Sequence, residues 1–90
     1  MVSSKFTNED RLYMASRLKD ARQACGLTQG QLAEKLGQTQ SFVAKYETRE
    51  RSLEFFELLT LCDALNISVK QLVHKDKQDI VCGPQRGETL

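Results

Sequence analysis

Residues 28–47 have the sequence TQGQLAEKLGQTQSFVAKYE, and the fold expected for the chain depends on this stretch. Thr28 can begin a helix, because its hydroxyl can accept a backbone N–H while Gln31, three residues later, reaches back to the N–H of Thr28. Gly37 follows the last apolar position, where the left-handed backbone that ends a helix costs glycine little. The pattern therefore predicts a helix over residues 28–36 that stops at a glycine turn.

The second half of the same stretch predicts another short helix. Thr39 is a cap candidate, and residues 40–46 can form a helix with Val43 and Tyr46 facing inward at i, i+3 spacing. Two short helices joined by a tight turn at this spacing form the arrangement that places the second helix in the major groove of DNA. The side chains that would then point outward are Gln40, Ser41, Ala44 and Lys45.

These residues resemble the Xre-type helix-turn-helix family of phage Cro and repressor proteins, over roughly residues 14–73. Gln38 departs from the family, which usually has an apolar residue in the turn. The resemblance implies an all-α fold, a compact five-helix repressor-like domain similar to small stand-alone regulators such as restriction-modification controller proteins. The family's apolar, small and turn positions have counterparts in Leu32, Leu36, Val43, Tyr46, Ala33 and Gly37.

The flanking sequence predicts three more helices. One is capped by Thr7 and continues to about Cys25, and another covers residues 53–65. A short fifth helix follows a capping pair formed by Ser68 and Gln71. The side chains expected to face inward from these helices are Met14, Leu18, Ala21 and Cys25, then Phe55, Leu58, Leu59, Cys62 and Leu65, and finally Val69, Leu72 and Val73.

Length and composition favour one small domain. The chain has 90 residues, of which 40% are hydrophobic, a size at which a single core suffices. We expect a flexible N-terminal arm over residues 1–7, the helix-turn-helix domain over residues 8–74 and a polar C-terminal tail over residues 75–90. The net charge of +1 neither supports nor excludes nucleic acid, so attraction to phosphate would depend on locally placed Lys and Arg.

Other functional classes find little support. Three cysteines, with no signal peptide and no long apolar run, predict a soluble cytoplasmic protein without membrane association. Catalysis is not expected, because His74 is the single histidine and no nucleophile with a base is evident. We expect no cofactor and no metal, because paired ligand spacing is missing among Cys25, Cys62, Cys82 and His74.

The outward side chains of the second motif helix are the candidates for base readout. Gln40 can offer a donor and an acceptor side by side, which matches N6 and N7 of adenine. Ser41 can donate or accept to several base edges, and Lys45 can donate to guanine or to a phosphate. Phe42 is a candidate for contact with a thymine methyl group, with packing against the fourth helix as the alternative. These side chains would set the operator sequence.

Phosphate contacts are expected from a different set of residues. The family resemblance implies that Gln29, at the start of the second helix, clamps the DNA backbone, where free N–H groups already favour an anion. Arg49, Arg51 and Lys35 are further candidates, although a charged loop can also be merely solvated. The resemblance also implies a structural ion pair between Arg22 and Glu47, with two solvated surface charges as the alternative.

A module of this size would cover one half-site, so we expect a homodimer on an inverted-repeat operator in double-stranded DNA. Leu53, Phe56 and Leu61 are the candidate interface residues, with core packing as the alternative. The predicted function is that of a transcription regulator, a repressor or a protein that recruits RNA polymerase. The alternative is an antitoxin or other protein-binding module, which would wrap a toxin-like partner with residues 75–90 and bind DNA secondarily. A short apolar patch at residues 80–82 could also reach a partner.

Overall fold

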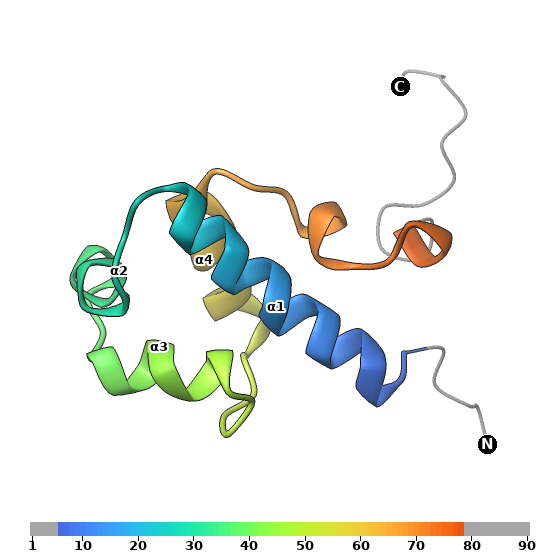
Figure 1. Cartoon of the computed structure of the whole chain (residues 1–90), viewed down its shortest axis with the longest axis horizontal. Helices are drawn as coiled ribbons and strands as arrows, with labels where there is room; N and C mark the ends of the chain where they lie inside the picture. The colour runs from blue at the N-terminus through green and yellow to red at the C-terminus, as the bar shows by residue number, and fades with distance from the viewer. Residues whose placement is uncertain (1–5, 79–90) are drawn as a thin grey trace.

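The computed structural model describes residues 6–78, which form four α-helices and two short 3₁₀ helices and contain no strand (Figure 1). The all-α fold is as expected, but the fifth helix is a 3₁₀ turn instead of an α-helix. Most of the N-terminal arm, most of the tail and the patch at residues 80–82 lie outside the described residues. In chain order the elements are α1 (Asn8–Ala24), α2 (Gln29–Leu36), α3 (Gln40–Glu47), α4 (Phe55–Leu65), η1 (Val69–Leu72) and η2 (Lys75–Lys77).

The caps expected around the central motif are present. The N–H of Gln31 donates to the Thr28 hydroxyl at 3.0 Å, and the Thr28 N–H donates to Oε1 of Gln31 at 2.9 Å. Gly37 ends α2 with a left-handed backbone, φ 69°. The Thr39 hydroxyl caps α3 by accepting a hydrogen bond from the N–H of Phe42. Gln38 is exposed in the turn between the two helices. Local side-chain chemistry therefore sets where α2 and α3 begin and where α2 ends.

One core joins the four helices. α1 runs across the front of the molecule in Figure 1, with α4 behind it and with α2 and α3 to one side. α1 packs on α3 and η1, while α2 packs on α3 and α4. The largest fully buried side chains come from all four α-helices and from η1, and they are Leu18, Leu32, Val43, Leu61 and Leu72.

The inward face of α4 differs from the expected one. The helix begins at Phe55, after Glu54 as its cap. Its buried residues are Leu61, Cys62 and Leu65, and Leu58 is partly buried against the core. Phe55 and Leu59 were expected in the core, but they are 62% and 37% exposed. Cys25 was expected on the buried face of α1 and is exposed instead, because the helix ends at Ala24 and residue 25 follows as its cap.

The packed structure continues beyond residue 74, where the tail was expected to begin. His74 is half-buried, with its ring stacked on Tyr13 of α1 at 3.9 Å between centroids. Nζ of Lys77 lies 2.6 Å from Oδ2 of Asp10, so η2 is held against the first turn of α1. Within residues 6–78, no helix combines the length and apolar character needed to cross a membrane.

Candidate nucleic-acid interface

The outer face of α3 carries three polar side chains without partners. Gln40, Ser41 and Lys45 are exposed, and their side chains make no hydrogen bond or ion pair with any residue in the range 6–78. The helix that carries them is fixed by its Thr39 cap and by the burial of Val43 on its inner face. A rigid helix thus presents amide, hydroxyl and ammonium groups to the solvent.

The side chain of Gln40 lies over the start of α2. A methyl group built on Gly30 would meet Oε1 of Gln40 at 3.6 Å, which is ordinary van der Waals contact. The first residue of α3 and the first turn of α2 therefore share one surface. This brings the candidate base-reading residue Gln40 and the candidate phosphate-contacting residue Gln29 to the same side of the molecule.

Phe42 does not belong to this surface. Its exposed fraction is 8%, and its ring packs edge-on against Tyr46 with 5.6 Å between centroids. The guanidinium of Arg51 covers the ring at 4.7 Å. Residues 42 and 43 occupy the same side of the helix as residue 46, because i, i+4 and i, i+3 positions of an α-helix lie close together. The prediction that Phe42 contacts a thymine methyl group is therefore corrected, because Phe42 is a residue of the core.

An ion pair ties α1 to the end of α3, and it extends to α2. Nε of Arg22 donates to Oε2 of Glu47 at 2.8 Å, with side chains only 9% and 3% exposed. The same carboxylate accepts from Nε2 of Gln29 through Oε1 at 3.0 Å, and Arg22 also donates to the carbonyl of Leu27 at 2.8 Å. The hydrogen bond to Glu47 raises the pKa of Arg22. The pair is buried, which excludes the alternative of two solvated charges, and it orients the amide of Gln29.

The loop after α3 holds its two arginines by different contacts. Arg49 has φ 67°, an unusual left-handed backbone for a residue with a side chain, and its Nη2 donates to Oδ1 of Asn8 at 3.0 Å. Arg51 makes a two-point ion pair with Glu57 at 2.8 and 2.9 Å, which raises the pKa of Arg51 and lowers that of Glu57. Arg49 therefore retains an unneutralised charge, whereas Arg51 is already paired.

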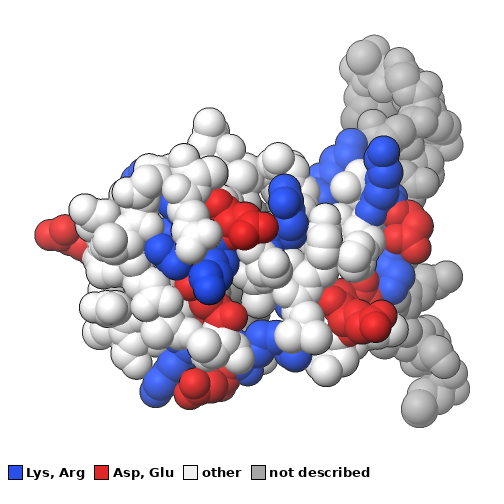
Figure 2. Space-filling model, in the orientation of Figure 1, with Lys and Arg blue, Asp and Glu red and all other residues white. Residues whose placement is uncertain are grey.

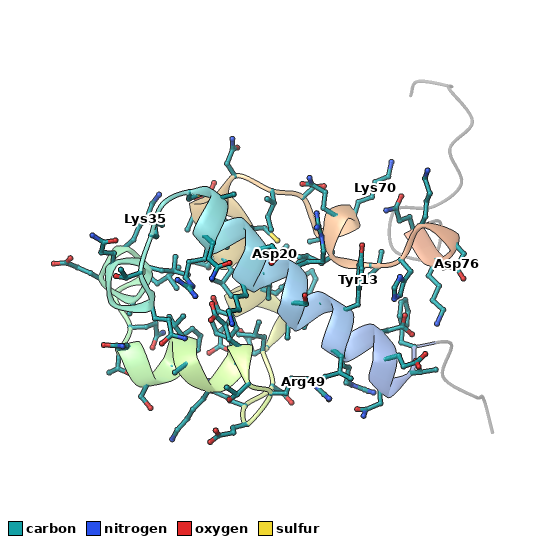
Figure 3. The ribbon with its side chains drawn as sticks, viewed as in Figure 1. Tyr13, Asp20, Lys35, Arg49, Lys70 and Asp76 are labelled. Atoms are coloured by element: carbon teal, nitrogen blue, oxygen red, sulfur yellow. The ribbon has the colours of Figure 1, made fainter. Side chains whose placement is uncertain are left out.

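Lys35 lies apart from the other candidate phosphate contacts. Its Nζ donates to the carbonyl of Ala64 near the end of α4 at 3.0 Å, and Figure 3 shows it on the side of α2 that faces away from α3. A cation at a helix C-terminus is favoured by the helix dipole. Lys35 therefore has an intramolecular partner, and it does not share a surface with the other candidate phosphate contacts Gln29 and Arg49.

Positive and negative side chains are interspersed over the face drawn in Figure 2, without a large region of one sign. This distribution agrees with the net charge of +1. On this face, binding of phosphate would therefore depend on individual, geometrically placed groups and not on a broad positive field.

A second exposed surface lies on the first half of α4. Phe56 is 67% exposed, and its ring packs edge-on with Phe55 at 5.4 Å between centroids. Together with Leu59, these two side chains form what we call the α4 apolar patch. Of the other interface candidates, Leu61 is fully buried and Leu53 is half-buried against the core. The sequence predicted Phe56 as an interface residue, but it predicted Phe55 and Leu59 to face the core, because all three positions belong to the same apolar pattern.

Several contacts were not predicted. Asn8 binds Arg49, which is forty-one positions away in the sequence. Glu57 pairs with Arg51. The capping box between Glu54 and Glu57 could have identified the start of α4 and, from that start, the exposed position of Phe55.

Comparison with known proteins gives matches to a family model, to a transcriptional regulator and to solved structures. The family model described as Helix-turn-helix matches residues 18–72. The HTH-type transcriptional regulator ImmR of Bacillus subtilis (strain 168) is 38% identical over 64 residues, which cover 71% of this chain and 50% of ImmR. The chain thus spans about half the length of that relative. The crystal structure of the restriction-modification controller protein C.AhdI from Aeromonas hydrophila matches with a TM-score of 0.65 and 33% identity, covering 71% of this chain and 93% of C.AhdI.

The matched range 18–72 contains the whole of α2, α3 and α4. It includes the glycine turn, both caps of the motif and the two ends of the Arg22–Glu47 ion pair. The chain belongs to the Xre-type helix-turn-helix family of DNA-binding transcription regulators.

Proposed function

We propose that this protein is a sequence-specific repressor that binds an inverted-repeat operator as a homodimer, with α3 in the major groove. The observation that carries this proposal is the outer face of α3, where Gln40, Ser41 and Lys45 are exposed and have no partner among the described residues. Side chains that make no internal contact keep their full hydrogen-bonding capacity for base edges. The burial of the opposite face fixes the orientation of the helix that carries them.

In this proposal Gln40 contacts adenine, Lys45 contacts guanine or a phosphate, and Ser41 adds a short polar contact. Gln29 binds the DNA backbone through the N–H of its amide that is not directed at Glu47. Arg49 adds a second phosphate contact from the other end of α3, since its charge is not neutralised by Asn8. Arg51 contributes less, because its charge is shared with Glu57.

The α4 apolar patch is the proposed contact between two copies. Phe55, Phe56 and Leu59 are exposed next to one another, and a contiguous apolar surface of this kind usually marks an interface. Two copies joined there would present two α3 helices to half-sites about 34 Å apart on the duplex. ImmR is a transcriptional regulator and C.AhdI is a controller protein, which supports a regulatory role for this chain.

Selection from a random duplex pool tests the operator proposal. We expect an inverted repeat, and Gln40→Ala should relax one position in each half-site at a cost of about 1–3 kcal/mol. Gln23→Ala is the matched control, because Gln23 is an exposed glutamine on α1 without a side-chain partner in the described residues. Retention of no duplex above background at low salt would refute the proposal.

Sedimentation tests the dimer separately. Phe55→Glu should shift the protein toward the monomer and weaken operator binding, because a carboxylate in an apolar contact carries a desolvation cost. Leu12→Glu is the control, since Leu12 is an apolar residue that is 52% exposed on α1 instead of α4. A monomer–dimer equilibrium that is equal in the two variants would contradict the assignment of the patch.

A further inference from the structure

A cavity lies between α1, α3 and the loop that follows α3, on the side of the molecule where Figure 3 labels Arg49. Its volume is about 140 Å³. The apolar part of its wall is formed by Met14 and Leu18 from α1, the buried residue Tyr46 from α3, and Leu53 from the loop. The volume is below that of a typical drug-sized ligand site, but an apolar wall with a few polar groups is the lining that small ligands use.

Ala15 also lines the cavity, and the polar part of its wall is formed by Ser52 and by three arginines, Arg11, Arg49 and Arg51. Arg51 is neutralised by its two-point pair with Glu57. Arg49 donates to the neutral amide oxygen of Asn8, and the side chain of Arg11 makes no hydrogen bond or ion pair within residues 6–78. Two guanidinium groups at one cavity therefore lack an anionic partner among the described residues, and the complementary ligand carries negative charge.

The size and the wall restrict the ligand class further. An engineered protein cavity of about 150 Å³ with apolar walls binds benzene, so the volume here fits one six-membered ring. A bare phosphate would satisfy the arginines but leave the apolar wall uncovered, while a neutral ring would leave the charges unpaired. A ring that bears a carboxylate satisfies both.

We propose that this cavity binds a small aromatic carboxylate, with the ring against Leu18, Tyr46 and Leu53 and the carboxylate between Arg11 and Arg49. The consequence for regulation rests on the function proposed above. Because Arg49 is also the proposed phosphate contact, a carboxylate bound to it competes with the DNA backbone and lowers operator affinity. The protein would then release its operator in response to a small acid.

The binding step is tested without DNA, so its failure is distinct from a failure of the proposed function. Benzoate is titrated into the full chain and followed by chemical-shift changes, with benzamide and inorganic phosphate as the comparison probes. We expect saturable benzoate binding with a Kd of roughly 1 mM, given the small number of atoms in the ligand. Benzamide and phosphate should bind at least about tenfold more weakly. Phosphate binding as tight as that of benzoate, or no saturation by benzoate, overturns the proposal.

Two variants locate the site. Arg11→Ala should weaken benzoate binding about tenfold, and Ser52→Phe should abolish it by placing a ring at the cavity from an exposed position. Arg17→Ala is the control, because Arg17 is an exposed arginine of α1 paired only with Asp20 at 3.9 Å. Equal benzoate affinity in the Arg11 and Arg17 variants overturns the assignment. If benzoate binds as expected, saturating benzoate should weaken operator binding several-fold in the wild type but not in Ser52→Phe.

Discussion

Oε1 of Glu47 lies 3.0 Å from Nε2 of Gln29, and the same oxygen lies 3.2 Å from Nη2 of Arg22. One buried carboxylate oxygen therefore holds a charged group of α1 and an amide of α2. Gln29 is oriented by a residue at the end of α3, the helix proposed to enter the groove. The first turn of α2 and the last turn of α3 are thus held as a unit.

Glu47→Gln should destabilise the fold by about 2–3 kcal/mol, because an amide cannot accept from all the donors that face it and Arg22 would remain buried without a counter-charge. Urea unfolding measures this loss. Asp20→Asn, in the exposed Arg17–Asp20 pair, should change the free energy of unfolding by less than about 0.5 kcal/mol. Equal effects of the two substitutions would show that Glu47 contributes no more than a surface charge.

The positive φ of Arg49 gives a matched comparison of two substitutions. Arg49→Gly and Arg49→Ala both remove the hydrogen bond to Asn8, but only glycine adopts φ 67° without strain. The glycine variant should be more stable than the alanine variant by about 1 kcal/mol in denaturant unfolding. Both variants should weaken every duplex to the same extent and lower the salt slope by about 1. An alanine variant as stable as the glycine variant would argue against backbone strain.

The hydroxyl of Tyr46 is buried and has no hydrogen-bond partner among the described residues. Tyr46→Phe should therefore stabilise the fold by about 1 kcal/mol at neutral pH, because it removes an unsatisfied polar group. Burial raises the pKa of Tyr46 well above its ordinary value of 10.0. Below pH 10 its contribution to stability does not change, and as the pH rises above 10 the unfolded chain ionises first and stability falls.

Thermal unfolding between pH 8 and pH 11.5 checks the alkaline part of this prediction. The wild type should lose up to about 1 kcal/mol per pH unit above pH 10 that Tyr46→Phe does not lose. Tyr13 is present in both proteins and cancels in the comparison. Parallel pH profiles for the two proteins would mean that the phenol ionises within the folded state.

The ion pair between Asp10 and Lys77 predicts a dependence on acid pH. The hydrogen bond from Lys77 and that from the Thr7 N–H lower the pKa of Asp10 from 3.8 to about 2. Because the folded pKa lies below the unfolded one, this stabilisation is present above about pH 4 and is lost as the pH falls toward 2. Asp10→Asn should have a lower thermal midpoint at pH 7, and the difference from the wild type should shrink between pH 4 and pH 2.

Asp76→Asn is the control for this measurement, since Asp76 is exposed on η2 and has no partner among the described residues. Its thermal midpoint should differ little from the wild type across the same pH range. A difference between Asp10→Asn and the wild type that stays constant down to pH 2 would exclude titration of Asp10 as its cause.

The sequence predicted well what depends on neighbours three or four residues apart. The caps at Thr28 and Thr39 and the glycine stop at Gly37 form as expected, since each requires only a fixed spacing along the chain. The pairing of Arg22 with Glu47 was anticipated from the family resemblance and not from spacing, because these residues are 25 positions apart. The extension of that pair to Gln29 was not anticipated.

The helix-turn-helix and the polar face of α3 follow from the amino-acid sequence alone, because turn and cap hydrogen bonds form within a few residues. The burial of particular aromatic side chains depends on how the helices pack. Phe42 lies inside, while Phe55 and Phe56 lie outside. A single core has room for few aromatic rings, so the way in which α1, α3 and α4 pack decides which rings are buried. That packing depends on residues far apart in the sequence, and a local pattern therefore does not predict it.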